Sequence, residues 1–170
     1  LIAVTGNRWT WWLSKCLWAI AGGIGLCLIS LVVCAMATCM TDGDFSLNPT
    51  PEINRMLDMY GAGSTSVNGS LLGFVLLLPC AISALVILQL AISLLINSAA
   101  GFLTTVTLLL ASAYYTSPLL LGDYLMAARL DIALTDGLIP ANGAVLSISL
   151  ILVCSLVGGL IFTRRDIMGR

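Results

Sequence analysis

Four stretches of this chain are almost entirely apolar, and its polar and charged residues gather between and around them. A helix needs roughly 20 mostly apolar residues to cross the hydrocarbon core of a bilayer. Residues 16–40, 71–96 and 144–162 meet or approach that length, and residues 99–115 form a shorter stretch. The pattern predicts an all-α integral membrane protein with four transmembrane helices in one domain, residues 1–170.

The second and third stretches are separated only by a short polar turn at Asn97 and Ser98. A single helix through both would be about 68 Å long at 1.5 Å per residue, which is twice the thickness of the hydrocarbon core. The two stretches are therefore expected to form a tight helical hairpin.

The positive charges predict how these helices are oriented. Four spans bring both ends of the chain to one side, and most of the acids lie on the other side. Lys and Arg near the ends of spans favour the cytoplasmic side. Both termini are therefore expected to be cytoplasmic, with residues 41–70 and 116–143 outside. Five of the seven cations lie at the terminal side: Arg8, Lys15, Arg164, Arg165 and Arg170.

Both external segments carry helical signals. In the first, Thr50, Pro51 and Glu52 supply an N-cap, a proline for the first turn and an acid beside it, which predicts a short external helix. In the second, residues 119–130 are too apolar for a free loop, yet they carry charges on no single face. This pattern favours a re-entrant or interfacial helical segment before the last span, broken around residues 136–140.

The composition narrows the chemistry further. Hydrophobic residues make up 59% of the chain, charged residues 9%, and the net charge is −1, which excludes a soluble globule and leaves no basic field for nucleic acid. The absence of histidine excludes histidine-based catalysis and histidine-ligated metal sites. The six cysteines lie in or at the edges of the spans without a CxxC pair, which is typical of packing residues. No catalytic, cofactor-binding or metal-ligating residue is predicted.

The spans contain few polar side chains and no charged one well inside them. Proton-coupled carriers, voltage sensors and intramembrane aspartyl proteases need buried ionisable groups, so this pattern argues against all three. Most Ser and Thr residues in spans bond to their own helix, whereas an amide is costly enough to indicate a contact or a pathway. The candidates for pathway or packing positions are Gln89, Ser93 and Thr104.

Three short motifs, in order along the chain, together resemble one family. Residues 6–15, GNRWTWWLSK, resemble the G-S-R-x-x-W-W-x-x-K stretch that leads into the third span of type-2, exporter-class ABC transporter permeases. Residues 121–129, LGDYLMAAR, are similar to the G-N-Y-x-M-x-x-R segment outside the last hairpin of many bacterial members. Residues 160–167, LIFTRRDI, resemble the habitual ending of these permeases.

The resemblance implies that the four helices correspond to the third to sixth spans of a six-helix permease, with two helices upstream. The start at Leu1 rather than Met fits this expectation. The family places broken re-entrant helices before its last span on the outer side, where Asp123, Tyr124 and Arg129 fall. Two features depart from the family: Asp123 replaces the usual amide, and the first external loop is long.

The resemblance also implies the partners. Family members contact a separate cytoplasmic ABC ATPase, which binds ATP and magnesium, and they pair with a second permease copy or a homologous permease in the bacterial cytoplasmic membrane. This chain would bind no cofactor itself. The candidate edge for coupling to the ATPase consists of Arg8, Trp11, Trp12 and Lys15. As an anchor, the same stretch is explained by aromatic and positively charged residues that flank a span.

The leading hypothesis is therefore a permease subunit of an ATP-driven exporter, which is not itself an enzyme. The alternative is a four-span structural or interaction protein of the tetraspanin or claudin sort, but those families staple their outer loops with cysteines, and residues 41–70 and 116–143 contain none. A third reading is a membrane enzyme acting on lipid. Its candidate residues would be Asp123, Arg129, Asp131 and Asp136.

Overall fold

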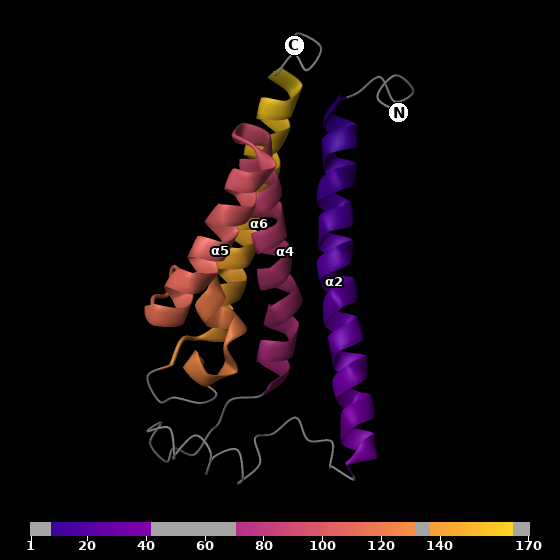
Figure 1. The fold of residues 1–170 in the computed structure, drawn as a ribbon, viewed down its shortest axis with the longest axis vertical. Helices are drawn as coiled ribbons and strands as arrows, with labels where there is room; N and C mark the ends of the chain where they lie inside the picture. Colours follow the sequence, from indigo (N-terminus) through magenta and orange to yellow (C-terminus); the bar gives the residue numbers. More distant parts are fainter. Residues whose placement is uncertain (1–7, 42–70, 132–136, 165–170) are drawn as a thin grey trace.

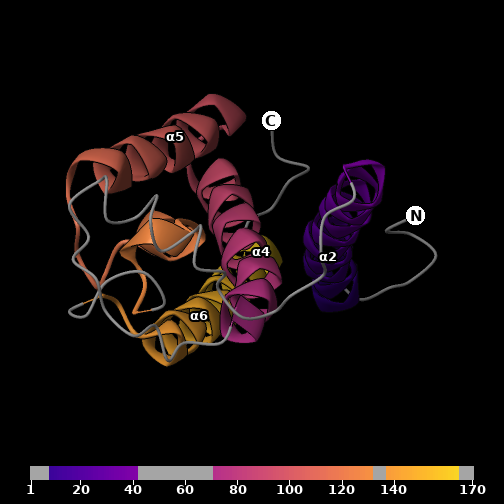
Figure 2. The same cartoon turned by 90° about the horizontal axis from the view of Figure 1, so that it is seen from below.

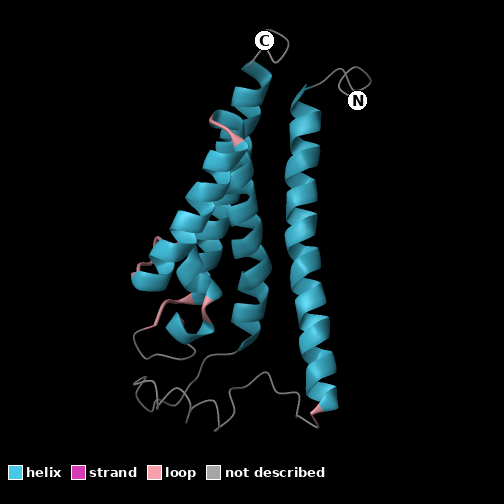
Figure 3. Cartoon of the chain, in the orientation of Figure 1, coloured by secondary structure: helices cyan, strands magenta, loops and turns pink. Residues whose placement is uncertain are grey.

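The computed structural model describes residues 8–41, 71–131 and 137–164, and all regular elements in these ranges are helical. The only β feature within them is an isolated bridge between Leu130 and Leu138. The elements are α2 (Arg8–Met40), α4 (Leu71–Leu95), α5 (Ser98–Tyr114), the short 3₁₀ helices η1 (Leu121–Leu125) and η2 (Ala127–Arg129), and α6 (Pro140–Arg164) (Figure 3).

Three of these helices are long and apolar enough to cross a membrane: Arg8–Met40, Leu72–Leu95 and Pro140–Thr163. The fourth, α5, has 17 residues and is shorter than the roughly 20 that a span needs. The described part of the chain is thus all-helical and of the kind found in membrane proteins. Its number of spans and the side that its termini face stay predictions.

Two helices begin earlier than their apolar stretches. α2 starts at Arg8, eight residues before the expected position, because polar and aromatic residues continue a helix beyond the apolar part of a span. α6 starts at Pro140 instead of near residue 144. Proline suits the first turn of a helix because its missing N–H would have no helical partner there.

α4 is the central helix of the bundle, and α2, α5 and α6 all pack against it (Figure 1). Its innermost residues include Ala81, Ala84 and Ile87, whose side chains are completely buried. Successive helices run in opposite directions, so the first residue of α2 and the last residue of α6 lie at the same end. Viewed along the bundle, α2 and α5 lie on different sides of α4 (Figure 2).

The turn between α4 and α5 is tight, as the short polar linker predicts. Asn97 is the N-cap of α5, and its side-chain oxygen accepts a hydrogen bond from the Ala100 N–H at 2.7 Å. Four residues later, Gly101 lies so close to Gln89 and Ser93 of α4 that a Cβ atom would overlap them. Small residues permit this close approach of backbones in membrane bundles.

α2 is packed at one end and open at the other. Its buried residues are Trp12, Cys16 and Gly23, and none of its residues from 24 to 40 is buried. Gly23 lies against Ser83 of α4. The expected short external helix that begins at Thr50 lies outside the described residues.

Candidate functional site: a buried polar segment beside α5

The segment of η1 and η2 lies between α4, α5 and α6, and η1 contacts all three helices (Figure 2). Leu121 packs with Ala81, Ala84 and Leu85, which lie near the middle of α4. Further out, Tyr124 and Leu130 form a cluster with Leu77. The chain therefore enters between the helices to about half the length of α4 and returns. A re-entrant or interfacial helical segment is expected here, and its described part consists of two short 3₁₀ helices.

Two glycines allow the segment to lie this close to its neighbours. A Cβ atom on Gly122 would overlap the Ser112 side chain of α5, and one on Gly143 would overlap the Tyr124 ring. Both Ser112 and Tyr124 are completely buried. Larger residues at Gly122 or Gly143 would therefore push the segment out of the bundle.

Asp123 and Arg129 form an ion pair at the centre of this segment. Asp123 has no exposed surface, and its second carboxylate oxygen, Oδ2, accepts a hydrogen bond from the Ser117 N–H at 2.7 Å. Both oxygens of the buried carboxylate thus have a partner, which offsets the cost of removing its charge from water. The Arg129 side chain is 20% exposed.

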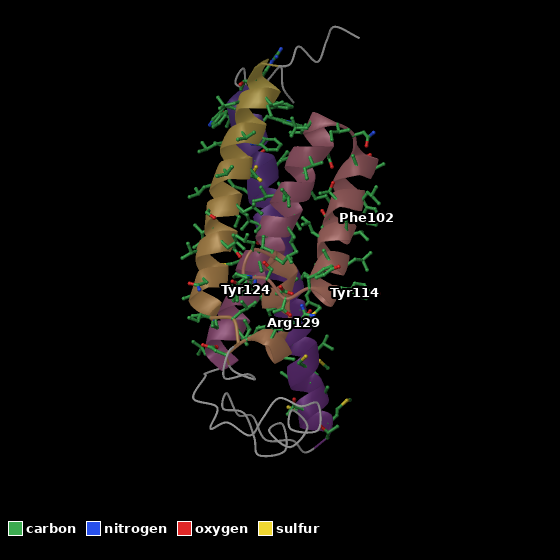
Figure 4. All side chains as sticks on the ribbon, turned by 90° about the vertical axis from the view of Figure 1, so that its left-hand side faces the viewer. Phe102, Tyr114, Tyr124 and Arg129 are labelled. Atoms are coloured by element: carbon green, nitrogen blue, oxygen red, sulfur yellow. The ribbon has the colours of Figure 1, made fainter. Side chains whose placement is uncertain are left out.

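Arg129 also closes the end of α5 (Figure 4). Its guanidinium group donates to the backbone oxygens of Ser112, Ala113 and Tyr115, at 2.8 Å for Ala113 and 3.2 Å for Tyr115. The last carbonyls of a helix have no partner within the helix, and the C-terminal end favours a positive charge. One side chain therefore caps α5 and neutralises Asp123.

Tyr124 connects the stretch before η1 with the start of α6. Its hydroxyl group donates to the backbone oxygen of Pro118 at 3.0 Å, while its ring lies against Gly143 at the start of α6. The polar atoms of Asp123, Tyr124 and Arg129 thus satisfy one another and the backbone. These hydrogen bonds hold the folded segment in place against α5 and α6.

The acids proposed for a lipid-processing enzyme do not gather in the described part of the chain. Asp123 forms an ion pair with Arg129, and Asp131 is exposed at the end of the segment. Asp136 lies outside the described residues. Among the residues that the structure describes, no group of three or more His, Cys, Asp or Glu residues could hold a metal ion.

The tryptophan-rich end of α2 packs against the end of α6. Trp12 is 1% exposed, and its indole N–H donates to the backbone oxygen of Ser155 at 2.8 Å. Trp11 stacks on Phe162 with 4.8 Å between ring centroids. The Trp9 and Trp12 rings occupy the space that side chains at residues 158–159, two consecutive glycines, would need.

The four candidate coupling residues thus differ in exposure. Trp12 is buried against α6, whereas Arg8 and Trp11 are partly buried. Lys15 is exposed, with its ammonium nitrogen 5.1 Å from the centre of the Trp11 ring. Lys15 is therefore the member of this group best placed to reach a partner.

The three polar candidates within the spans lie in the hairpin of α4 and α5. The Ser93 hydroxyl donates to the Gln89 backbone oxygen at 2.7 Å, and the Thr104 hydroxyl donates to Ala100 at 2.8 Å, so both bond within their own helix. Gln89 and Ser93 lie against Gly101 of the facing helix. Their place is at a helix contact, and their proposed part in a substrate path stays a prediction.

Sequence reasoning missed Ser112 and the paired glycines of α6. Ser112 has no exposed surface, and its hydroxyl donates to the Leu109 backbone oxygen of its own helix at 2.7 Å. Many serines in spans bond in this way, so the sequence does not distinguish Ser112 from the others. The Gly158-Gly159 pair and the three tryptophans near the start of α2 are both visible in the sequence. Glycines leave room for a close neighbour at a helix contact, and this room beside the three large rings is the signal that could have paired them.

No protein-family model matches this sequence, and neither a curated protein nor a solved structure matches it. The family expectation therefore depends on the three sequence motifs alone.

Proposed function

We propose that this chain is the membrane-spanning permease subunit of an ATP-driven exporter. The observation that carries this proposal is the folding of the LGDYLMAAR motif into two short 3₁₀ helices before the last long helix, with residues 121–124 buried between the longer helices. Type-2 permeases have a broken re-entrant element at this place. A short segment that enters the bundle and returns just before α6 is compatible with such an element and supports the proposal.

The arrangement at the other end supports the same proposal. The family couples to its ATPase through cytoplasmic segments, one of which precedes the third span. The corresponding stretch here is helical from Arg8 onward and presents Lys15 at the surface beside Trp11. The ends of α2 and α6 are joined by the Trp12 and Phe162 contacts, so a force applied at Lys15 would reach both helices.

In the proposed mechanism, two permease copies form a path at their interface in the bacterial cytoplasmic membrane. A separate ATPase binds ATP and magnesium and closes, and the cytoplasmic coupling segments convert that closure into rotation of the spans. The path opens alternately to the two sides. Both termini of this chain would face the cytoplasm, since that side receives most of its Lys and Arg residues.

Purification of the tagged chain in mild detergent, with mass spectrometry and an ATPase assay, tests this proposal. We expect a stoichiometric partner that carries a Walker A motif, together with vanadate-sensitive ATP hydrolysis. Isolation of the protein without an ATPase would contradict the proposal and favour the four-span structural protein. One observation favours that alternative: the Tyr124 hydroxyl and the Asp123–Arg129 pair bond within the folded chain, as in an element that only stabilises a bundle.

Lys15→Glu tests the coupling edge within the same assay. Reversal of this exposed charge is expected to reduce recovery of the ATPase several-fold, and Lys15→Arg, which keeps the charge, should leave recovery unchanged. Trp12→Ala is expected to weaken association as well, but through the packing of α2 on α6 because its ring is buried. Recovery of the ATPase at the normal ratio with Lys15→Glu would refute this role.

A further inference from the structure

α5 ends well short of the helices beside it. Gly101 of α5 lies opposite Gln89 and Ser93 of α4, and the two helices run in opposite directions. Counting about thirteen residues along each helix places Tyr114 opposite Leu78. α4 continues for about seven more residues toward its first residue, which corresponds to roughly 10 Å at 1.5 Å per residue.

The apolar surface extends further on the α2 side of the bundle. Gly23 of α2 lies against Ser83 of α4, so the same count places Val32 about four residues beyond the level of Tyr114. Val32 and Met36 are 58% and 59% exposed, and Leu76 of α4 is 63% exposed. Exposed apolar side chains of this kind are stable when they contact lipid hydrocarbon.

The chain beyond α5 is not suited to contact hydrocarbon. Residues 115–120 form no helix or strand, and Tyr115, Thr116 and Leu119 among them are exposed. Lipid-exposed irregular backbone does not occur within the hydrocarbon region, because its polar groups would lack partners. Tyr114 and Tyr115 are 82% and 71% exposed, and tyrosine is enriched at the level of lipid headgroups.

The apolar surface on the α2 side thus ends further along the bundle than α5, whose last residue, Tyr114, points outward (Figure 4). We propose that the bilayer is thinned beside α5, so that phospholipid headgroups contact residues 114–119 at a depth where the α2 side still contacts acyl chains. α5 spans about 25 Å with its 17 residues, against roughly 30 Å for an undisturbed core. A helix shorter than the core is accommodated by thinning the bilayer.

Spin labels at matched levels test this inference. Tyr115→Cys on the α5 side and Leu76→Cys on α4 lie at nearly the same level, and Val32→Cys lies further out on α2. Each is introduced into a chain whose six native cysteines are replaced by alanine. The chain is then reconstituted in vesicles of phosphatidylcholine and phosphatidylglycerol with 18-carbon acyl chains, and oxygen and nickel-chelate collision rates report the depth of each label.

We expect the label at residue 115 to lie at the headgroup level and the labels at residues 76 and 32 to lie at least about 5 Å deeper, the difference between the two thicknesses. In vesicles with 14-carbon chains the difference should shrink. Equal depths for residues 115 and 76 would overturn the inference, because a flat bilayer gives that result. Leu119→Cys, whose native side chain is 78% exposed, provides a second label beyond α5. The outcome does not depend on the proposed transport function.

Discussion

At the scale of single residues, Arg129 combines an ion pair with several backbone hydrogen bonds in one side chain. It neutralises a fully buried carboxylate and binds three backbone oxygens at the end of α5. Its planar guanidinium group presents five N–H donors in a fixed geometry, which a lysine ammonium group does not. The identity of this residue, and not only its charge, is therefore expected to matter.

Arg129→Gln should destabilise the protein by about 3–5 kcal/mol, because it leaves the buried Asp123 carboxylate without an opposite charge. Thermal unfolding in detergent, followed by near-UV circular dichroism, measures this effect. The double variant with Asp123→Asn should recover part of the loss, since no uncompensated charge remains. An Arg129→Gln protein as stable as the parent would show that the ion pair has no structural role.

Trp12→Phe removes the indole donor to Ser155 but keeps an aromatic ring, and we expect a loss of about 1 kcal/mol in the free energy of unfolding. The matched control is Trp18→Phe, because the Trp18 side chain is 77% exposed and should change stability by less than about 0.5 kcal/mol. Chemical denaturation in micelles provides the comparison. Equal effects at the two positions would contradict the importance of the Trp12 hydrogen bond.

At the scale of elements, close contacts at glycines set the positions of the helices and of the inserted segment. Gly101 allows the close approach of α4 and α5, and Gly158 leaves room for the Trp12 ring. Gly122 and Gly143 allow η1 to lie close to α5 and α6. Gly22 and Gly25 of α2 differ from these, since a Cβ atom there would meet nothing within 4 Å. The glycines thus fall into two groups with opposite expected responses to substitution.

Gly143→Ala should destabilise the protein by about 1–3 kcal/mol because the added methyl group overlaps the Tyr124 ring. Gly22→Ala, at an open position within a helix, should be neutral or stabilise by up to about 1 kcal/mol. Melting temperatures of the two variants in the same detergent test this contrast. A Gly143→Ala protein that melts no lower than Gly22→Ala would refute the close contact.

The sequence predicts these elements unevenly. The long apolar runs locate α4 and α6 because a span must bury its backbone within a helix, whatever its neighbours are. The apolar stretch around Asp123 and Arg129 predicts a re-entrant or interfacial segment, but not their ion pair or the full burial of Asp123, because these depend on neighbours such as Ser112 and Ser117 that only the folded chain brings close. For the same reason, a chain without charges inside its spans still carries an ion pair between its helices.

At the scale of the whole molecule, the bundle has two unlike ends. The end formed by Arg8 and Trp12 of α2 and Phe162 of α6 is closed by aromatic contacts. At the other end, α2 continues to Met40 without a buried residue beyond Gly23, while the segment of η1 and η2 fills the space between the remaining helices. The mechanical link between α2 and the rest of the described chain is thus concentrated at one end.

The charges of the chain predict the orientation of the whole molecule in the membrane. Protease treatment of intact spheroplasts should leave tags at both termini uncut, and disruption of the membrane should expose both to cleavage, because the Lys- and Arg-rich ends are expected in the cytoplasm. A reporter inserted between residues 42 and 70 should show the reverse pattern. Cleavage of either terminal tag in intact spheroplasts would contradict this topology.

The cap that Arg129 places on α5 also constrains the order of biogenesis. When α5 leaves the ribosome, the backbone oxygens of Ser112, Ala113 and Tyr115 lack the partner that they have in the finished structure, because Arg129 is synthesised later. A 17-residue helix whose last carbonyl groups lack partners is expected to insert into the bilayer poorly on its own. We therefore expect α5 and the segment after it to reach their final positions together, after the ribosome has passed Arg129.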